Sequence, residues 1–298
     1  MANTRDIRRR IKSVKNTAQI TRAMQLVAAS KMRKAQDQAL AGRPYAEEMN
    51  KVLVNLRERT GPEDHPLLEQ RDGEREIMLV ISTDKGLCGP LNTNLLRAVT
   101  DEAADSSTFV TVGRKGRQTL ARLRKDLKAD FEIKDPVHFP EVKRVAGFLI
   151  DQFLAGKVDR VKVAFTNFIS TLSQEPVIET LLPIQYTSIG KAHEFEGMGE
   201  RAPAAAEGEV EEGFGYLFEP DPDAVLEGIL PLYAEYLVYQ MVLEARASEH
   251  SARMVAMKNA TDNAEQLIKD LTLEYNKLRQ AAITNELLEI TTAMKALE

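Results

Sequence analysis

The sequence predicts a mixed protein of the α+β or α/β class, in which N- and C-terminal helices form a long antiparallel coiled coil beside a central α/β domain. Both ends of the 298-residue chain are nearly free of Gly and Pro, and the middle alternates apolar runs with amphipathic segments. Aromatic residues make up only 6% and Trp is absent, which suits long helices packed through aliphatic residues. We expect four segments: an N-terminal helix over 1–60, an α/β domain over 75–190, an acidic loop over 191–220 and a C-terminal helix over 221–298.

The N-terminal segment has the spacing of one long helix. Residues 4–59 contain a single Gly and a single Pro, Gly42 and Pro44. Apolar residues recur at helical intervals in Ile7, Ile11, Val14 and Ala18. We expect a helix that starts near Thr4, is bent or interrupted at 42–44, and ends before 60–62.

The C-terminal segment is longer still. The Asp221–Pro222–Asp223 triplet is typical of a helix start, and Gly228 and Pro231 should disturb the first turns. No Gly or Pro occurs in the 67 residues after Pro231, so the helix would be roughly 100 Å long, against roughly 60–80 Å for the N-terminal one. Antiparallel pairing would bury both apolar seams and leave the longer helix running past its partner. Small residues between 245 and 264 would allow the helices to approach closely. A helical bundle with a broken C-terminal segment is the alternative.

The middle of the chain changes to the pattern of a Rossmann-like α/β domain. Apolar runs predict strands over 76–82, 107–112, 129–133, 160–168 and 176–183, and amphipathic segments predict helices over 94–104, 117–127 and 141–155. This alternation indicates a largely parallel sheet. The last strand should lie at an edge, because Pro176 and Pro183 flank it.

Two Gly-rich turns in this domain are candidate phosphate sites. Gly86–Gly89 follows the first strand and Gly113–Gly116 follows the second, but neither has the spacing of a dinucleotide or P-loop motif. Pro90 also removes one amide donor. We interpret both as structural turns, and keep open a nucleotide-binding enzyme that uses Lys85 and the first turn.

No other chemistry stands out. Cys88 is solitary and is expected to be an inert thiol, and the four His have no metal-ligand spacing. The sequence therefore predicts no metal, no cofactor and no catalytic residue. Its longest apolar stretches, 77–81 and 145–150, are too short to span a bilayer, and no signal peptide is visible, so we expect a soluble or peripheral protein.

Charge is unevenly distributed. Residues 1–34 carry ten basic side chains and one acid, whereas residues 191–223 carry ten acids and two bases. The basic segment could bind nucleic acid, anionic lipid or an acidic protein surface. No aromatic residue precedes Tyr45, which weakens the first two possibilities, because stacking on bases and anchoring in lipid both use aromatic rings.

Several longer motifs make the sequence specific. The segments that carry them are 5–11 (RDIRRRI), 16–24 (NTAQITRAM), 27–34 (VAASKMRK), 83–89 (TDKGLCG), 251–263 (SARMVAMKNATDN) and 275–290 (YNKLRQAAITNELLEI). In order and over nearly the whole chain they resemble the gamma subunit of F-type ATP synthases, of bacterial type. One departure is Ala293–Met294, where the family usually has a Gly-Ala pair; this change should extend the last helix.

The resemblance implies a non-catalytic rotor shaft. Its two long helices would turn inside the ring of alpha and beta subunits, and the α/β domain would lie next to the epsilon subunit and the c-ring. Rotation would couple proton flow through the c-ring to ATP synthesis or hydrolysis on the beta subunits. The expected location is the cytoplasmic face of the bacterial plasma membrane, with only indirect membrane contact and no nucleic acid.

The resemblance also implies which residues contact partners. On the first helix these are Met24, Lys31, Arg33 and Lys34. On the last helix they are Arg253, Arg279, Gln280, Thr284 and Glu286, of which the last three would make polar contacts to the beta subunits.

Overall fold

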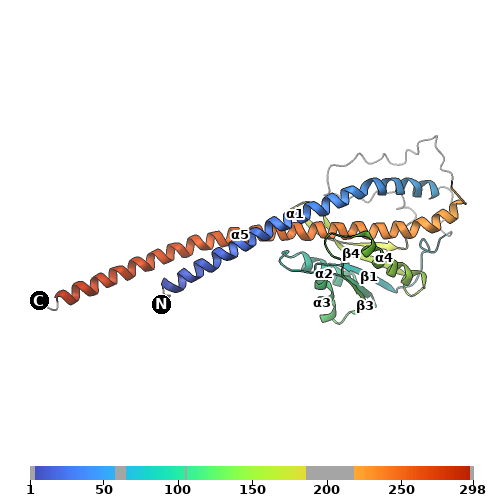
Figure 1. The fold of residues 1–298 in the computed structure, drawn as a ribbon. Helices are drawn as coiled ribbons and strands as arrows, with labels where there is room; N and C mark the ends of the chain where they lie inside the picture. Colours follow the sequence, from blue (N-terminus) through green and yellow to red (C-terminus); the bar gives the residue numbers. More distant parts are fainter. Residues whose placement is uncertain (1–3, 58–64, 105, 186–217, 296–298) are drawn as a thin grey trace. The chain divides into compact units, whose positions relative to one another are not determined.

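The computed structural model describes residues 4–57, 65–104, 106–185 and 218–295 (Figure 1). Two compact units are present, one made of Met1–Ala28 with Met254–Glu298 and the other of Ala29–Arg253. The helices α1 (Thr4–Arg57) and α5 (Pro222–Lys295) each contribute to both units.

The first unit is an antiparallel pair of helices, the start of α1 beside the last part of α5 (Figure 1). Small and aliphatic side chains fill its seam: Ile7, Ala18 and Ala28 from α1, and Met257, Ala264 and Leu271 from α5 are buried. This confirms the predicted pairing of the two ends of the chain. Small residues in a seam bring helix backbones close together, as the sequence indicated.

One polar pair interrupts this apolar seam. The hydroxyls of Thr21 and Thr261 lie 2.7 Å apart and both residues are buried. Each hydroxyl also lies within hydrogen-bond distance of a carbonyl of its own helix, Ala18 and Met257 respectively. Since a hydroxyl has one proton, one threonine donates across the seam while the other donates within its helix. A buried polar pair of this kind favours one register of the two helices over its neighbours.

The end of α5 has a different character. Beyond Leu271, no residue of the described part of α5 is buried. Apolar side chains there are exposed nevertheless: Leu273, Ile283, Leu287, Leu288, Ile290 and Met294. The helix continues through Ala293–Met294 to Lys295, in line with the absence of a Gly stop.

The second unit contains a five-stranded sheet in the order β3-β2-β1-β4-β5. Its strands are β1 (Glu76–Ile81), β2 (Thr108–Val112), β3 (Asp126–Phe131), β4 (Arg160–Phe168) and β5 (Gln174–Leu182). The first four are parallel, and β5 pairs antiparallel with β4. The helices between them are α2 (Leu91–Glu102), α3 (Arg114–Arg122) and α4 (Phe139–Leu154).

Two apolar cores cover the two faces of this sheet. On one face Met78, Val80 and Ala164 pack with Leu95, Leu96 and Val99 of α2 and Leu120 of α3. On the other face Leu79, Val163 and Phe165 pack with residues of α4, α5 and the later part of α1. The alternation of Val161, Val163 and Phe165 therefore marks the face of β4 that α5 covers.

The predicted elements all exist, although their bounds shift by a few residues. The largest shift is at the end of α3, which lies at Arg122 and not at 127, because a turn follows there and β3 already begins at Asp126. The edge position of β5 is confirmed. Most of the predicted acidic loop over 191–220 lies outside the described residues.

We expected a bend or an interruption at 42–44, and the interruption is wrong, since α1 continues through Pro44. Contacts from α5 support this part of α1: the Tyr236 hydroxyl donates to the Gly42 carbonyl at 2.8 Å, and the Tyr236 ring contacts Tyr45. Packing here outweighs the local cost of proline. Likewise α5 runs through Gly228 and Pro231. The helix starts at Pro222 as predicted, and Asp221 caps it, its Oδ1 accepting from the Ala224 amide at 2.8 Å.

A buried carboxyl lies where α5 crosses the sheet. Glu244 is 2% exposed, and its Oε1 has no hydrogen-bond partner among the described residues. Burial, and secondly the charge of Glu179 on β5, raise the pKa of Glu244 from its ordinary 4.5 to about 9. The folded protein therefore holds a proton here that the unfolded chain releases at neutral pH.

This proton makes stability depend on pH. Because the pKa of Glu244 is higher in the folded state, stability falls as pH rises from about 4.5 to about 9, with a slope approaching about 1.4 kcal/mol per pH unit. Glu244→Gln removes this dependence, so its stability relative to the unchanged protein should be greater at pH 8 than at pH 5. Urea unfolding of both proteins at the two pH values tests this, and an equal difference at both would contradict it.

Candidate functional site

Helix α5 passes over the carboxyl ends of the parallel strands and is enclosed there. None of the residues from Tyr233 to Ser251 is exposed. Hydroxyls fix its direction, since Ser248 donates to the Thr166 carbonyl and Ser251 to the Thr171 carbonyl, both at 2.9 Å. The helix thus runs parallel to β4 and leaves the sheet at its carboxyl end. In open α/β folds, ligands bind at that end.

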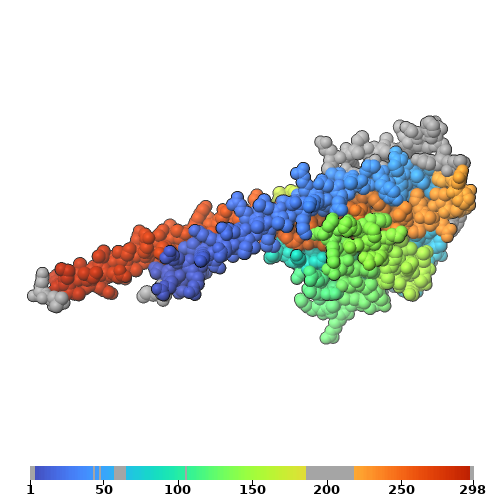
Figure 2. All heavy atoms as spheres, viewed as in Figure 1, coloured from blue at the N-terminus to red at the C-terminus, as the bar shows by residue number. Residues whose placement is uncertain are grey.

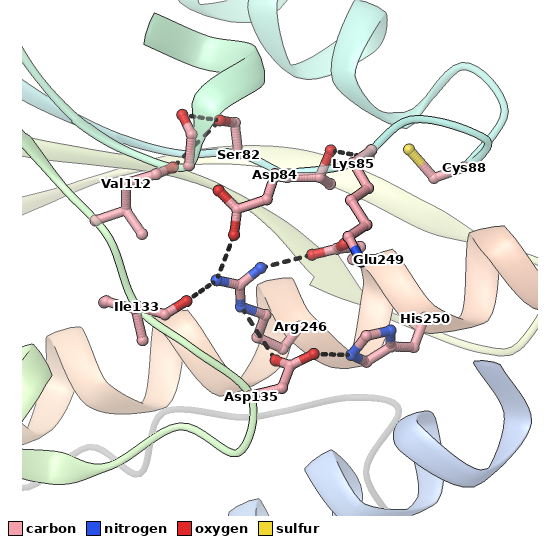
Figure 3. Close-up of polar contacts among 12 residues, drawn as sticks. Ser82, Asp84, Lys85, Cys88, Val112, Ile133, Asp135, Arg246, Glu249 and His250 are labelled. Atoms are coloured by element: carbon pink, nitrogen blue, oxygen red, sulfur yellow. Dashed lines mark hydrogen bonds and ion pairs between the residues drawn. The ribbon is translucent and has the colours of Figure 1, made fainter. Parts of the chain in front are cut away.

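Arg246 of α5 occupies the centre of this region (Figure 3). It is 5% exposed, and its guanidinium donates to the Ile133 carbonyl at 2.6 Å and to Glu249 at 2.8 Å. It also forms longer ion pairs, at 3.7 Å, with Asp84 after β1 and Asp135 after β3. One buried cation therefore connects α5 with two loops of the sheet.

The charges around Arg246 are mutually stabilised. Burial lowers the pKa of Arg246, but Glu249, Asp135 and Asp84 outweigh it, so that the pKa is raised and the guanidinium stays charged. The pKa of Asp135 is held far below its usual range, chiefly by a hydrogen bond to His250, against the effect of burial, with help from Lys31 and Arg246. The Asp135 carboxylate lies 3.2 Å from His250 Nε2 and 3.0 Å from Lys31 Nζ. We call Lys31, Asp84, Asp135, Arg246, Glu249 and His250 the charged cluster.

Arg253 extends this network to the first Gly-rich turn. Its guanidinium pairs with Glu249 at 2.8 Å and reaches the carbonyls of Lys85 and Gly86 at 3.3–3.4 Å. The carbonyl oxygens of this turn thus face a cation of the same chain. A phosphate would instead need amide groups that point toward it, so this geometry does not favour a phosphate site.

Amides of the second turn, and the Thr83 amide just before the first turn, are also already used. The Thr83 amide donates to Asn92 Oδ1, and the amides of Arg114 and Gly116 donate to Asp84 Oδ1 and Ser82 Oγ. Gly113 has φ +96°, and a Cβ there would lie 2.2 Å from the Ser82 carbonyl oxygen, so only Gly fits. These contacts favour the interpretation of the two turns as structural.

Cys88 and the acidic side chains offer little for metal chemistry. Cys88 is 2% exposed, and burial raises the pKa of its thiol, which disfavours the reactive thiolate. Within the described residues no group of three or more His, Cys, Asp or Glu could hold a metal ion.

The nine residues expected to contact partners fall in different environments. Lys31 and Arg253, both partly engaged with the charged cluster, lie in the second unit, together with exposed Arg33 and Lys34. Met24, half-buried, lies in the first unit with Arg279, Gln280, Thr284 and Glu286, which are all exposed. The Thr284 hydroxyl donates to the Gln280 carbonyl at 3.0 Å.

Sequence reasoning missed most of the charged cluster. Arg246, Glu249 and His250 have the i, i+3, i+4 spacing of a solvated helix face, but they are buried. A usable signal was present in the small residues Ala245, Ala247 and Ser248 around them, which suggest close packing on every side of the helix.

Removal of Arg246 should be far more damaging than removal of an exposed arginine. Arg246→Met leaves Glu249, Asp135 and Asp84 without their shared cation, and we expect a loss of about 3–5 kcal/mol in the free energy of unfolding. Arg117→Met is the matched control, because its ion pair with Asp130 is largely exposed and worth about 0.2–1 kcal/mol. Urea unfolding followed by circular dichroism measures both; similar losses would show that the cluster does not hold α5 in place.

Comparisons with known proteins agree with this architecture. The family model described as "ATP synthase" matches residues 3–297. An ATP synthase gamma chain of Opitutus terrae is 53% identical over 300 residues, covering 99% of both chains, and that of Akkermansia muciniphila is 49% identical, covering all of both.

Solved structures show the same fold. A chain of the Euglena gracilis mitochondrial ATP synthase (OSCP/F1/c-ring) has a TM-score of 0.68 at 23% identity, covering 99% of this chain and 94% of its own. A chain of the Tetrahymena thermophila central stalk and c-ring has a TM-score of 0.58 at 25% identity, covering 81% and 99%. With full-length identity to curated gamma chains of about one half, this chain belongs to the ATP synthase gamma chain family.

Proposed function

We infer that this gamma chain is the central-stalk rotor subunit of an F-type ATP synthase. In this function it catalyses no reaction itself. The paired ends of α1 and α5 act as the shaft, and its rotation changes the conformation, and hence the nucleotide affinity, of the beta subunits during ATP synthesis or hydrolysis. A shaft does this only through contacts that differ between conformations of its partners.

The observation that carries the proposal is the apolar surface at the end of α5. The six apolar side chains after Leu271 are 49–65% exposed on a helix that continues for more than 20 residues without a buried position in the described range. Exposed apolar surface of this kind marks a contact with another protein. It fits a sleeve that surrounds the helix, as the alpha and beta subunits would.

We propose the remaining partners from the same arrangement. The epsilon subunit and the c-ring would meet the second unit, and the coupling residues Met24, Lys31, Arg33, Lys34, Arg253, Arg279, Gln280, Thr284 and Glu286 would face the alpha and beta subunits. Within the described ranges, no helix is both long and apolar enough to cross a bilayer. Attachment to the cytoplasmic face of the bacterial plasma membrane would then depend on the c-ring.

The proposal is tested by assembly. The chain should show no ATPase activity alone, co-purify with alpha and beta subunits, and raise the steady activity of their mixture. ATPase activity of the purified chain, or failure to bind the alpha and beta subunits, would contradict the proposal. Nucleotide binding measured by calorimetry on the chain alone would favour the competing enzyme hypothesis.

Met24 offers a test of coupling as distinct from assembly. Met24→Lys adds a cation to a half-buried position of α1, next to the basic residues of that helix. We expect normal assembly and ATP hydrolysis but a reduced proton gradient per ATP in membrane vesicles. Met24→Leu, which keeps volume and polarity, is the control and should pump normally. Equal pumping by both variants would remove Met24 from the set of coupling residues.

A further inference from the structure

The segment that runs from α3 into β3 is rich in positive charge. Seven cations and one acid lie between positions 114 and 128: Arg114, Lys115, Arg117, Arg122, Arg124, Lys125 and Lys128 against Asp126. Because β3 is an edge strand, this segment lies on the outer side of the sheet, away from α5 (Figure 1). Green atoms of this region stand out from the surface of the second unit in Figure 2.

The end of α3 has the geometry of a Schellman motif, but an arginine occupies the position where glycine is usual. The Arg124 amide donates to the Ala121 carbonyl and the Lys125 amide to the Leu120 carbonyl, each at 3.1 Å. Arg124 therefore occupies the left-handed position, with φ +56°, where glycine is favoured and any side chain costs free energy. A residue other than glycine in this conformation is a starting point for a functional hypothesis about its side chain.

That side chain makes no ion pair with the described residues. Arg122 and Arg124 are exposed, and no carboxylate of the described part of the chain lies within 4.0 Å of either. Between them Leu123 is 49% exposed. The turn thus presents two guanidinium groups around one apolar side chain. Guanidinium groups bind phosphate oxygens through paired hydrogen bonds, and a leucine gains from contact with acyl chains.

The position of this turn in the sheet is compatible with contact to a membrane. It lies at the amino-terminal end of β3, because α3 leads into that strand. Helix α5 leaves the parallel sheet at the opposite, carboxyl end. The turn and the exit of α5 thus lie at opposite ends of this sheet. In the proposed function, on which this step rests, the second unit meets the c-ring, and we assign the end of the sheet with the α3–β3 turn to that side.

We propose that Arg122, Leu123 and Arg124 form a contact with the anionic lipid surface beside the c-ring. This adds a direct membrane contact to the indirect one expected through the c-ring. Each cation near an anionic membrane strengthens binding roughly fivefold, so the contact alone is weak. A weak contact suits a subunit that is held near the membrane by other means and must move along it as it turns.

A single tryptophan can report on this turn alone, because the chain contains no Trp. In full-length protein carrying Leu123→Trp, emission should shift to the blue on vesicles containing phosphatidylglycerol, and brominated lipid should quench it. The shift should be absent on phosphatidylcholine vesicles and be lost at high salt. When Arg122→Gln and Arg124→Gln are added to this variant, the affinity of the turn for anionic vesicles should fall roughly thirtyfold. Leu172→Trp, on the exposed hairpin at the other end of the sheet, is the matched control and should not shift.

Arg124→Gly separates the proposed role from a structural one. Glycine relieves the left-handed position, so this variant should melt at a higher temperature and yet, with Leu123→Trp, give a smaller spectral shift on anionic vesicles. An unaltered emission spectrum of the Leu123→Trp protein while it sediments with the vesicles would show that only the basic N-terminal helix binds lipid, and would overturn the proposal. So would an equal shift on neutral vesicles, or a shift that needs an added protein subunit. Co-purification with alpha and beta subunits would be unaffected by any of these outcomes.

Discussion

The burial of Arg246 is the constraint on which the arrangement of α5 depends. A guanidinium removed from water is tolerated only where acids and carbonyls surround it, and here these come from the loop after β1, the loop after β3 and the next turn of α5 itself. The three sources must be in place together. This requirement fixes the position of α5 along the sheet more sharply than apolar packing does. Aliphatic side chains remain in contact after a small displacement of the helix, whereas a buried charge that loses its partners costs much free energy.

The same constraint explains why a Gly-rich turn at the carboxyl end of β1 does not resemble a phosphate site. The crevice above a doubly wound sheet is open in ligand-binding folds. Here α5 fills it, and Arg253 and Arg246 supply the positive charge from inside the chain. Gly113 and Ser82 then serve packing between the two loops and not an external anion.

Much of this fold follows from the sequence, and the exceptions have a common cause. The structure confirms three local signals: the period of Val161, Val163 and Phe165, the helix start at 221–223, and the edge strand near Pro176. The continuity of α1 through Pro44 was not predictable, because it depends on Tyr236, nearly 200 residues away. The charged cluster was hidden for the same reason: Asp84 and Asp135 meet Arg246 only in the folded chain. The nine residues proposed for coupling were suggested by the resemblance alone, because the spacing of polar residues on an exposed helix could not have distinguished them.

The part of α5 that packs on the sheet and the part after Leu271 make different kinds of contact, as a rotating shaft requires. Ala245 and Ala247 belong to the core of the second unit, which also contains Ala35 and Ala39 of α1, and Ala264 is buried in the first unit. Where α5 crosses the sheet, buried charges and hydroxyls give contacts that depend on direction and distance. After Leu271 the helix presents apolar side chains to its surroundings, and apolar contacts do not depend on a fixed direction between two groups. A rotor needs both kinds of contact: directional ones where the shaft is fixed to its own domain, so that torque is transmitted, and non-directional ones where the shaft must turn against its partners.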